Sequence, residues 1–135
     1  MAVKTYHGSC HCGAVRYEVD LDLSQGGAKC NCSFCAKVRN WSAAVKPEAF
    51  RLLTDPAAMT DYTFGSHSVH HTFCRTCGVH ACGRGELEAM GGAFATVSLA
   101  CLDDADVSAL AEAPVAFADG RNNNWWNPPA ETRHL

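Results

Sequence analysis

Hydrophobic and polar side chains alternate along short stretches of this chain, as they do in half-buried β-strands. In residues 14–19, Val15, Tyr17 and Val19 would point to one face of a strand, and the charged residues between them to the other. Similar apolar stretches predict further short strands at residues 41–45, 61–64, 68–73, 93–99 and 115–118.

Turn and helix signals separate these strands. The segments 61–64 and 68–73 would form a hairpin around Gly65-Ser66. Residues 103–111 are the clearest helical segment, because acidic residues stand at its start and a proline follows its end. Residues 48–50 predict a single helical turn, and the end of the chain is typical of a loop. Many short strands and little helix together predict a mainly β fold with one or two short helices.

Length and composition are those of a small folded domain. The 135 residues predict a single domain spanning 1–135. Apolar residues make up 47% of the chain and charged residues 19%, which excludes a disordered tail or a charge-rich coiled coil. The net charge of -3, with 11 Lys and Arg residues, argues against binding to nucleic acid backbones. No apolar run approaches the roughly 20 residues that a membrane span needs, so no membrane partner is expected.

Nine cysteines are the unusual feature of the composition. The N-terminal residues contain no apolar core of the kind found in secretory signals, so export is not expected. The expected compartment is the reducing cytoplasm, in which disulfides do not persist. Metal binding is therefore the first explanation for the cysteines.

Seven of the cysteines fall into three local groups. These are the C-x-C pair Cys10 and Cys12, the C-x-C-x-x-C triplet Cys30, Cys32 and Cys35, and the C-x-x-C pair Cys74 and Cys77. Such spacing lets neighbouring thiolates of one loop bind a single zinc ion at about 2.3 Å. Gly13 and Gly78 follow the two pairs and permit the tight turns that point backbone amides at sulfur.

The count of thiolates divides these groups into two zinc sites, which predicts two zinc ions per chain. The two pairs together supply four ligands, which fill a tetrahedron and make a closed, structural site. The triplet supplies three ligands, and three protein ligands with one open position is the pattern of catalytic zinc. An alternative is two structural sites, with the triplet completed by His80, Cys82 or another residue.

The remaining reactive side chains have simple structural interpretations. Cys82 and Cys101 fit small, buried apolar positions. The adjacent pair His70-His71 would point to opposite faces of a strand, so the two rings are poorly placed to bind one metal. His80 is the better functional candidate, because it follows the last cysteine pair closely. The pair Asp103-Asp104 fits a helix start, where carboxylates cap free amides, rather than an acid–base pair.

Three segments carry a resemblance to a known family: GSCHCGAVRYEV at 8–19, CNCSFC at 30–35 and FCRTCG at 73–78. In order, spacing and flanking residues, residues 8–102 resemble the glutathione-dependent formaldehyde-activating enzymes, a family that also includes centromere protein V. The resemblance implies a small zinc-bound, mainly β domain of several coiled antiparallel sheets. It also implies that Cys10, Cys12, Cys74 and Cys77 bind a structural zinc, and that Cys30, Cys32 and Cys35 bind a catalytic zinc.

A cationic and aromatic rim is predicted around the open zinc position. Lys37, Arg39 and Trp41 follow the triplet, and Arg121 and Trp125 stand near the end of the chain. The cations would attract the two carboxylates of glutathione, and the tryptophans would form walls of a substrate pocket. The alternative is a solvated face with partly buried aromatic rings.

These observations predict a zinc-dependent enzyme of the carbon–sulfur lyase type. A thiol such as glutathione would take the open zinc position, and its adduct with formaldehyde or another small aldehyde would be formed or cleaved. The alternative function is a non-catalytic zinc module that binds a protein partner. An exchangeable position on the second zinc would distinguish the enzyme from the module.

Overall fold

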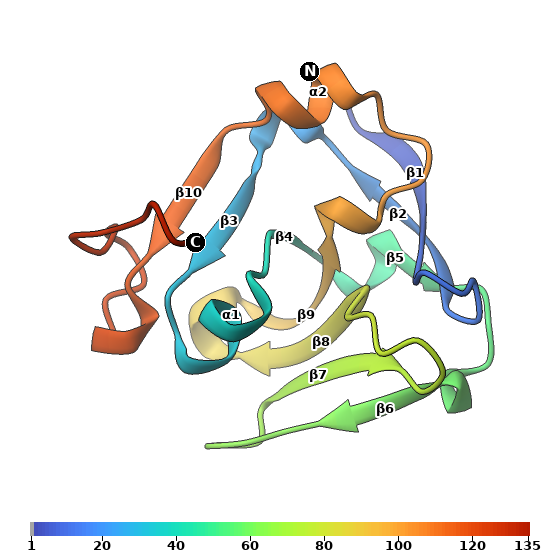
Figure 1. Ribbon diagram of the computed structural model, residues 1–135, viewed down its shortest axis with the longest axis horizontal. Coiled ribbons are helices and arrows are strands. Elements are labelled where there is room, and N and C mark those ends of the chain that lie inside the picture. Colours follow the sequence, from blue (N-terminus) through green and yellow to red (C-terminus); the bar gives the residue numbers. More distant parts are fainter. Residues whose placement is uncertain (1) are drawn as a thin grey trace.

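Two β-sheets dominate the computed structural model, which describes residues 2–135 (Figure 1). The smaller sheet has the order β1-β2-β5 and consists of β1 (Lys4–Ser9), β2 (Arg16–Leu21) and β5 (Phe50–Leu52). The larger sheet has the order β10-β3-β4-β9-β8-β7-β6. Its strands are β3 (Gly27–Cys30), β4 (Ser42–Val45), β6 (Met59–Tyr62), β7 (Val69–Cys74), β8 (Cys82–Leu87), β9 (Gly92–Ser98) and β10 (Val115–Ala118). The pair β10 and β3 is parallel, and the other pairs are antiparallel.

Helical structure is sparse. The α-helices of residues 2–135 are α1 (Ser33–Val38) and α2 (Val107–Glu112). Short 3-10 turns connect strands at Leu23–Gln25, Pro47–Ala49, Pro56–Ala58, Glu88–Met90, Leu99–Cys101 and Gly120–Asn122. The predicted mainly β fold is therefore confirmed. None of the described helices has the length and apolar character needed to cross a membrane.

Six of the strands were predicted from the sequence and four were not. The predicted segments correspond to β2, β4, β6, β7, β9 and β10, and β6 and β7 form the expected hairpin. The strands β1, β3 and β8 escape prediction because their sequences show no clean alternation. The strand β5 escapes it because it has three residues and its first, Phe50, was assigned to the predicted helical turn, which the structure places at Pro47–Ala49. In β8 the sequence CGRGEL contains two glycines, which are poor strand formers, but pairing on both sides with β7 and β9 holds the strand in place.

The predicted helix at residues 103–111 begins later than expected, and the role given to its acidic residues was wrong. The helix α2 starts at Val107, so Asp103 and Asp104 lie before it. The Ser9 hydroxyl donates to Asp103 at 2.7 Å, and the backbone N–H of His7 donates to Asp104 at 2.8 Å. These carboxylates therefore tie the segment before α2 to β1, because their hydrogen bonds to that strand outweigh helix capping.

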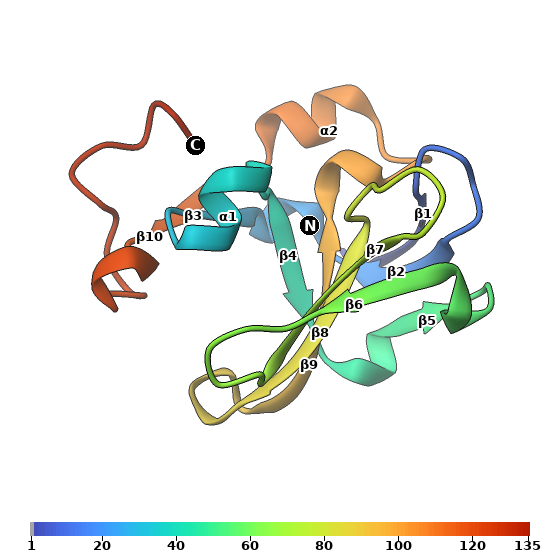
Figure 2. The ribbon, with the colours of Figure 1, turned by 60° about the horizontal axis from the view of Figure 1, so that its bottom comes forward.

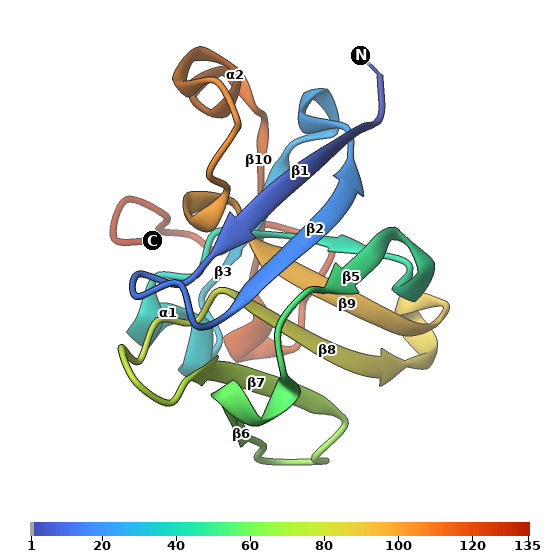
Figure 3. The same ribbon diagram turned by 90° about the vertical axis from the view of Figure 1, so that its right-hand side faces the viewer.

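The core lies where β2 of the small sheet faces β9 of the large one. Figure 3 shows β1 and β2 running across the direction of β8 and β9. Tyr17 and Val19 are fully buried on one face of β2, as the alternation predicts, and they share a core cluster with Val97 and Leu99. Cys74 belongs to the same cluster, so one predicted metal site is joined directly to the core.

The Tyr17 side chain is buried, and its hydroxyl has no hydrogen-bond partner among residues 2–135. Its ring packs against Phe50 at a centroid distance of 5.3 Å. Because an unpaired buried hydroxyl costs about 1–3 kcal/mol, Tyr17→Phe is expected to leave the free energy of unfolding unchanged or raise it by about 1 kcal/mol. Urea denaturation measures this, with Tyr17→Leu as a control that removes the ring and should lower stability by about 2 kcal/mol. A loss of stability in Tyr17→Phe as large as in the control would show that the hydroxyl is satisfied.

Candidate metal centres and cavity

The first cysteine cluster brings together the loop after β1 and the loop after β7. The sulfur atoms of Cys10, Cys12, Cys74 and Cys77 all lie within 4.8 Å of one another. Figures 1 and 3 show the two loops next to each other at one end of the small sheet. The Sγ–Sγ distance is 3.7 Å from Cys10 to Cys12 and 3.6 Å from Cys12 to Cys74. A tetrahedron with zinc–sulfur bonds of about 2.3 Å has an edge of about 3.8 Å, so the four sulfur atoms fit a zinc ion.

Backbone amides point at the sulfur atoms of this cluster. The N–H of Val15 donates to Cys10 at 3.3 Å, and the N–H of Cys77 donates to Cys74 at 3.4 Å. Backbone N–H groups of Cys12 and Val79 lower the pKa of the Cys77 thiol to about 6. These amides favour thiolates, which are the form that binds metal. The donor set is complete with four sulfurs, two of them buried, as expected of a structural site.

The second cluster forms where β3 passes into α1. Cys30 ends β3, Cys32 caps the N-terminus of α1 and Cys35 lies in its first turn, with all three sulfur atoms within 4.8 Å of one another. The N–H of Cys32 donates to the Cys30 sulfur and the N–H of Cys35 to the Cys32 sulfur, both at 3.3 Å. The Asn40 amide lies 3.8 Å from the Cys35 sulfur.

The three thiols of this cluster cannot all ionise without a cation. Hydrogen bonds from Cys30 and Cys35 lower the pKa of Cys32, whereas hydrogen bonds with Cys30 and Cys32 raise the pKa of Cys35. One thiolate is thus stabilised at the expense of the others, and a bound metal would be needed to hold three. Three sulfur donors suit a soft or borderline ion such as zinc.

Within residues 2–135, no histidine, carboxylate or further cysteine joins the three sulfurs as a metal ligand. Cys82, one of the predicted alternatives, is buried against Thr72 and Met59. Burial raises the pKa of the Cys82 thiol to about 11. Cys101 packs at the edge of the core. Both leftover cysteines therefore occupy the small apolar positions expected of them, and neither joins the triplet as a fourth ligand.

A cavity of about 660 Å³ opens beside the three-cysteine cluster. Cys32 and Cys35 form part of its wall, and strands β7, β8 and β9 form another. The apolar and aromatic residues of the lining are Phe64, Val69, Leu87, Phe94 and Trp125. They stand beside uncharged polar residues that include Ser33, Asn40, Ser42, Ser66, Thr96 and Asn123. Volume and lining are typical of a small-molecule site.

Three histidines line this cavity: His70, His71 and His80. Burial lowers the pKa of the His71 and His80 rings. His71 stacks on Phe34 at a centroid distance of 3.9 Å, whereas His70 bonds Asp61 at 2.7 Å. The two neighbouring histidines thus have separate partners and form no joint metal site among the described residues. The position of His71 in a cavity was not predicted, because the neighbouring strand β8 shows no strand pattern in its sequence.

The C-terminal segment forms one side of the cavity and is hydrogen-bonded to Asn31, which lies between two cysteines of the triplet. Figure 2 shows this segment, in red, beside β3 and α1. The Arg121 guanidinium donates through Nε to the carbonyl of Asn31 at 3.0 Å, and the Asn31 amide donates to Asp119 at 2.8 Å. Gly120 lies so close that a Cβ there would come within 2.6 Å of both the Cys30 sulfur and the Trp125 ring. Only glycine permits this approach.

The residues predicted to form a substrate rim lie in different places. Arg121 and Trp125 line the cavity. Lys37 and Arg39 are exposed and lie outside the described lining, with Arg39 donating to the Leu135 carbonyl at 3.3 Å. Trp41 packs against the core, and its buried indole N–H has no hydrogen-bond partner in the part of the chain that the structure describes. Substrate contacts thus remain predictions, and the geometry favours them at Arg121 and Trp125.

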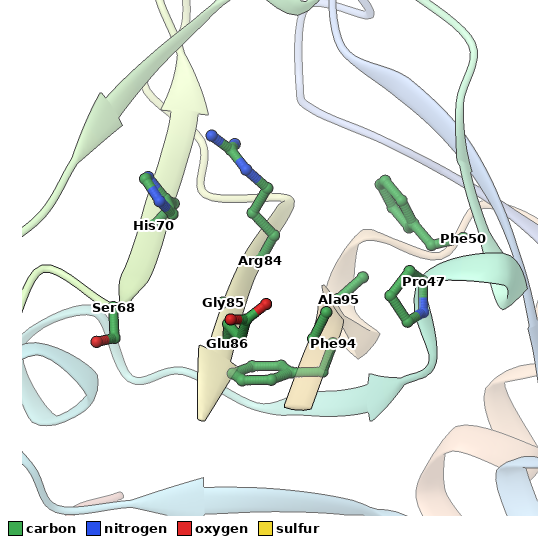
Figure 4. A pocket seen from close by; sticks show the side chains of 10 residues that line it. Pro47, Phe50, Ser68, His70, Arg84, Gly85, Glu86, Phe94 and Ala95 are labelled. Carbon is green, nitrogen blue, oxygen red and sulfur yellow. The ribbon is translucent and has the colours of Figure 1, made fainter. Parts of the chain in front are cut away.

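A second groove of about 380 Å³ adjoins the cavity, and His70 and Phe94 line both. Figure 4 shows His70, Arg84 and Phe50 around it. Arg84 and Glu86 of β8 line this groove alone, whereas His71 and Thr96 line the cavity alone. No cysteine is among the described residues that line it, so the chemistry belongs to the cavity beside the triplet.

Comparison with known proteins agrees with this arrangement. The family model described as glutathione-dependent formaldehyde-activating enzyme matches residues 5–117. A crystal structure of a Rhodobacter sphaeroides protein, a structural genomics target, is 31% identical in sequence with a TM-score of 0.67. That similarity covers 82% of this chain and 99% of the other. Because the family model spans both cysteine clusters and the strands between them, the chain belongs to the glutathione-dependent formaldehyde-activating enzyme family.

Proposed function

We propose that this protein is a zinc-dependent enzyme that forms or cleaves the adduct of a thiol with a small aldehyde. One observation supports the proposal: Cys32 and Cys35 of the three-cysteine cluster line the cavity of about 660 Å³, and none of the four other clustered cysteines is among its described lining residues. The four-cysteine cluster has no position left for a substrate. The family name makes glutathione and formaldehyde the first pair to test.

Cys30, Cys32 and Cys35 would hold the catalytic zinc, and the other four ligands a structural zinc. Bound there, zinc would favour the thiolate form of a substrate thiol and polarise a carbonyl. In the forward direction a sulfur–carbon bond forms and the carbonyl π electrons move to oxygen. The thiol proton ends on that oxygen, so the reaction needs a group that accepts and returns a proton.

His80 is the best-placed group for this proton transfer. Its Nδ1 donates to the carbonyl oxygen of Thr72 at 2.6 Å, which leaves a lone pair on Nε2. Because burial lowers the pKa of the ring, His80 stays a proton acceptor at pH values where an ordinary histidine is charged. We therefore expect the rate of adduct formation to decline with falling pH only at pH values below the usual pKa range of histidine.

His80→Gln is expected to slow adduct formation by about 100-fold, because glutamine cannot accept and return a proton. Exchange spectroscopy by NMR measures the rate between free aldehyde and thiol adduct on zinc-loaded protein. His134→Gln, an exposed histidine outside the cavity, is the matched control and should leave the rate unchanged. A wild-type protein that does not accelerate exchange with any thiol and aldehyde would contradict the proposed function and favour a binding module.

A further inference from the structure

Apolar side chains from several elements form part of the wall of the cavity beside the three cysteines, next to uncharged polar residues such as Ser42 and Thr96. Val69, Leu87 and Phe94 come from three adjacent strands of the large sheet, and Phe64 from the hairpin loop between β6 and β7. Trp125 faces them from the C-terminal segment. A ligand in this cavity would therefore meet hydrocarbon on several sides.

Imidazole and phenyl rings stack on one another along one wall of this cavity. The ring of His71 lies 3.9 Å from that of Phe34 and 5.2 Å from that of Phe64, with interplanar angles of 28° and 15°. His80 meets Phe34 edge-on at 5.5 Å. Such stacks offer a face on which another ring can pack.

Charge is scarce in the same cavity. Arg121 is the one lysine or arginine among the described lining residues, and no aspartate or glutamate belongs to that lining. The Arg121 Nε is already engaged by the Asn31 carbonyl at 3.0 Å. Lys37 and Arg39, which would have paired with an anionic thiol, lie outside the lining.

Glutathione fits this distribution poorly. It carries two carboxylates and an ammonium group, and each needs a partner when removed from water. Three thiolates holding a zinc ion would leave a further negative charge beside the cavity. One arginine would have to balance all of these anionic groups.

We propose that the thiol used by this protein carries an uncharged apolar body, such as an aromatic ring, and that glutathione is its poorer substrate. The proposal rests on the proposed function and specifies its substrate class. The sulfur would lie beside Cys32 and Cys35, and the apolar body would pack among Phe64, Leu87 and Phe94.

Titration calorimetry of the zinc-loaded full chain tests the preference with two probes, phenylmethanethiol and glutathione. We expect phenylmethanethiol to bind on the order of tenfold more tightly, because its ring leaves water for an apolar wall. Methyl NMR spectra should show shifts at Val69 and Leu87 on binding, a readout that does not depend on turnover.

A charge-insertion variant sharpens the test. Leu87 stands at the mouth of the cavity and is 36% exposed, so a lysine there can reach solvent and the site. Leu87→Lys is expected to weaken phenylmethanethiol binding and to strengthen glutathione binding, each about fivefold or more. Leu53→Lys is the matched control, because Leu53 is 55% exposed and lies outside the cavity lining.

The possible results test the proposed substrate class and the proposed function separately. Tighter binding of glutathione, abolished by Cys35→Ser, would overturn the apolar substrate and leave the thiol-binding function intact. Failure of both thiols to bind would overturn both. Preference for phenylmethanethiol, reversed or reduced in Leu87→Lys but not in Leu53→Lys, would support the inference.

Discussion

Cys74→Ser is expected to abolish the folded state. Cys74 is 1% exposed and joins the core, and its cluster links segments that lie 62 residues apart at Cys12 and Cys74. Structural zinc contributes about 10–16 kcal/mol of binding free energy in small domains, which exceeds or matches the total stability of most proteins. Circular dichroism and amide NMR spectra should therefore show an unfolded or insoluble variant.

Cys32→Ser provides the matched control, since it removes one sulfur from the other cluster. Cys32 caps α1 by accepting a hydrogen bond from the Cys35 N–H, and serine is a favoured residue at that position. The variant is expected to stay folded, with its loss of stability confined to a local loop. Equal loss of thermal stability in Cys74→Ser and Cys32→Ser would contradict the assignment of structural and catalytic clusters.

Cys35→Ser is expected to reduce the rate of adduct formation by roughly 1,000-fold while the fold is retained. Metal stabilisation of developing charge contributes several kcal/mol, and each 1.4 kcal/mol corresponds to a tenfold change in rate. Exchange NMR gives the rate, and elemental analysis should show loss of the zinc held by the triplet.

Cys101→Ser is the control for this second prediction, because Cys101 belongs to neither cluster. It should keep both zinc ions and full activity. Full activity in Cys35→Ser would show that the triplet is not the reaction centre.

The alternation of apolar and polar residues was sufficient to predict strands that bury one face. The alternation in β2 correctly placed Tyr17 and Val19 in the core. It was insufficient for β8, whose glycines are held by pairing with β7 and β9, and for the exposed strand β1. Such strands depend on long-range partners, which a local pattern does not contain.

Cysteine spacing was sufficient to predict the two cysteine clusters but not the cavity beside one of them. Ligands separated by one or two residues must lie close together, so the two clusters could be predicted as groups of four and three. The cavity walls come from β7, β8 and β9, and their side chains meet only through strand register. Lys37 and Arg39 are near the triplet in sequence, yet the helix α1 directs this stretch away from the cavity lining.

The proposal that the three cysteines hold a zinc ion with an open position is tested most directly by cadmium-113 NMR of protein in which cadmium replaces zinc. Two resonances of equal intensity are expected, one from a site with four sulfurs and one from a site with three. Addition of a small neutral thiol such as 2-mercaptoethanol should shift only the second resonance. A single resonance, or two resonances that both ignore the thiol, would contradict an open catalytic metal site.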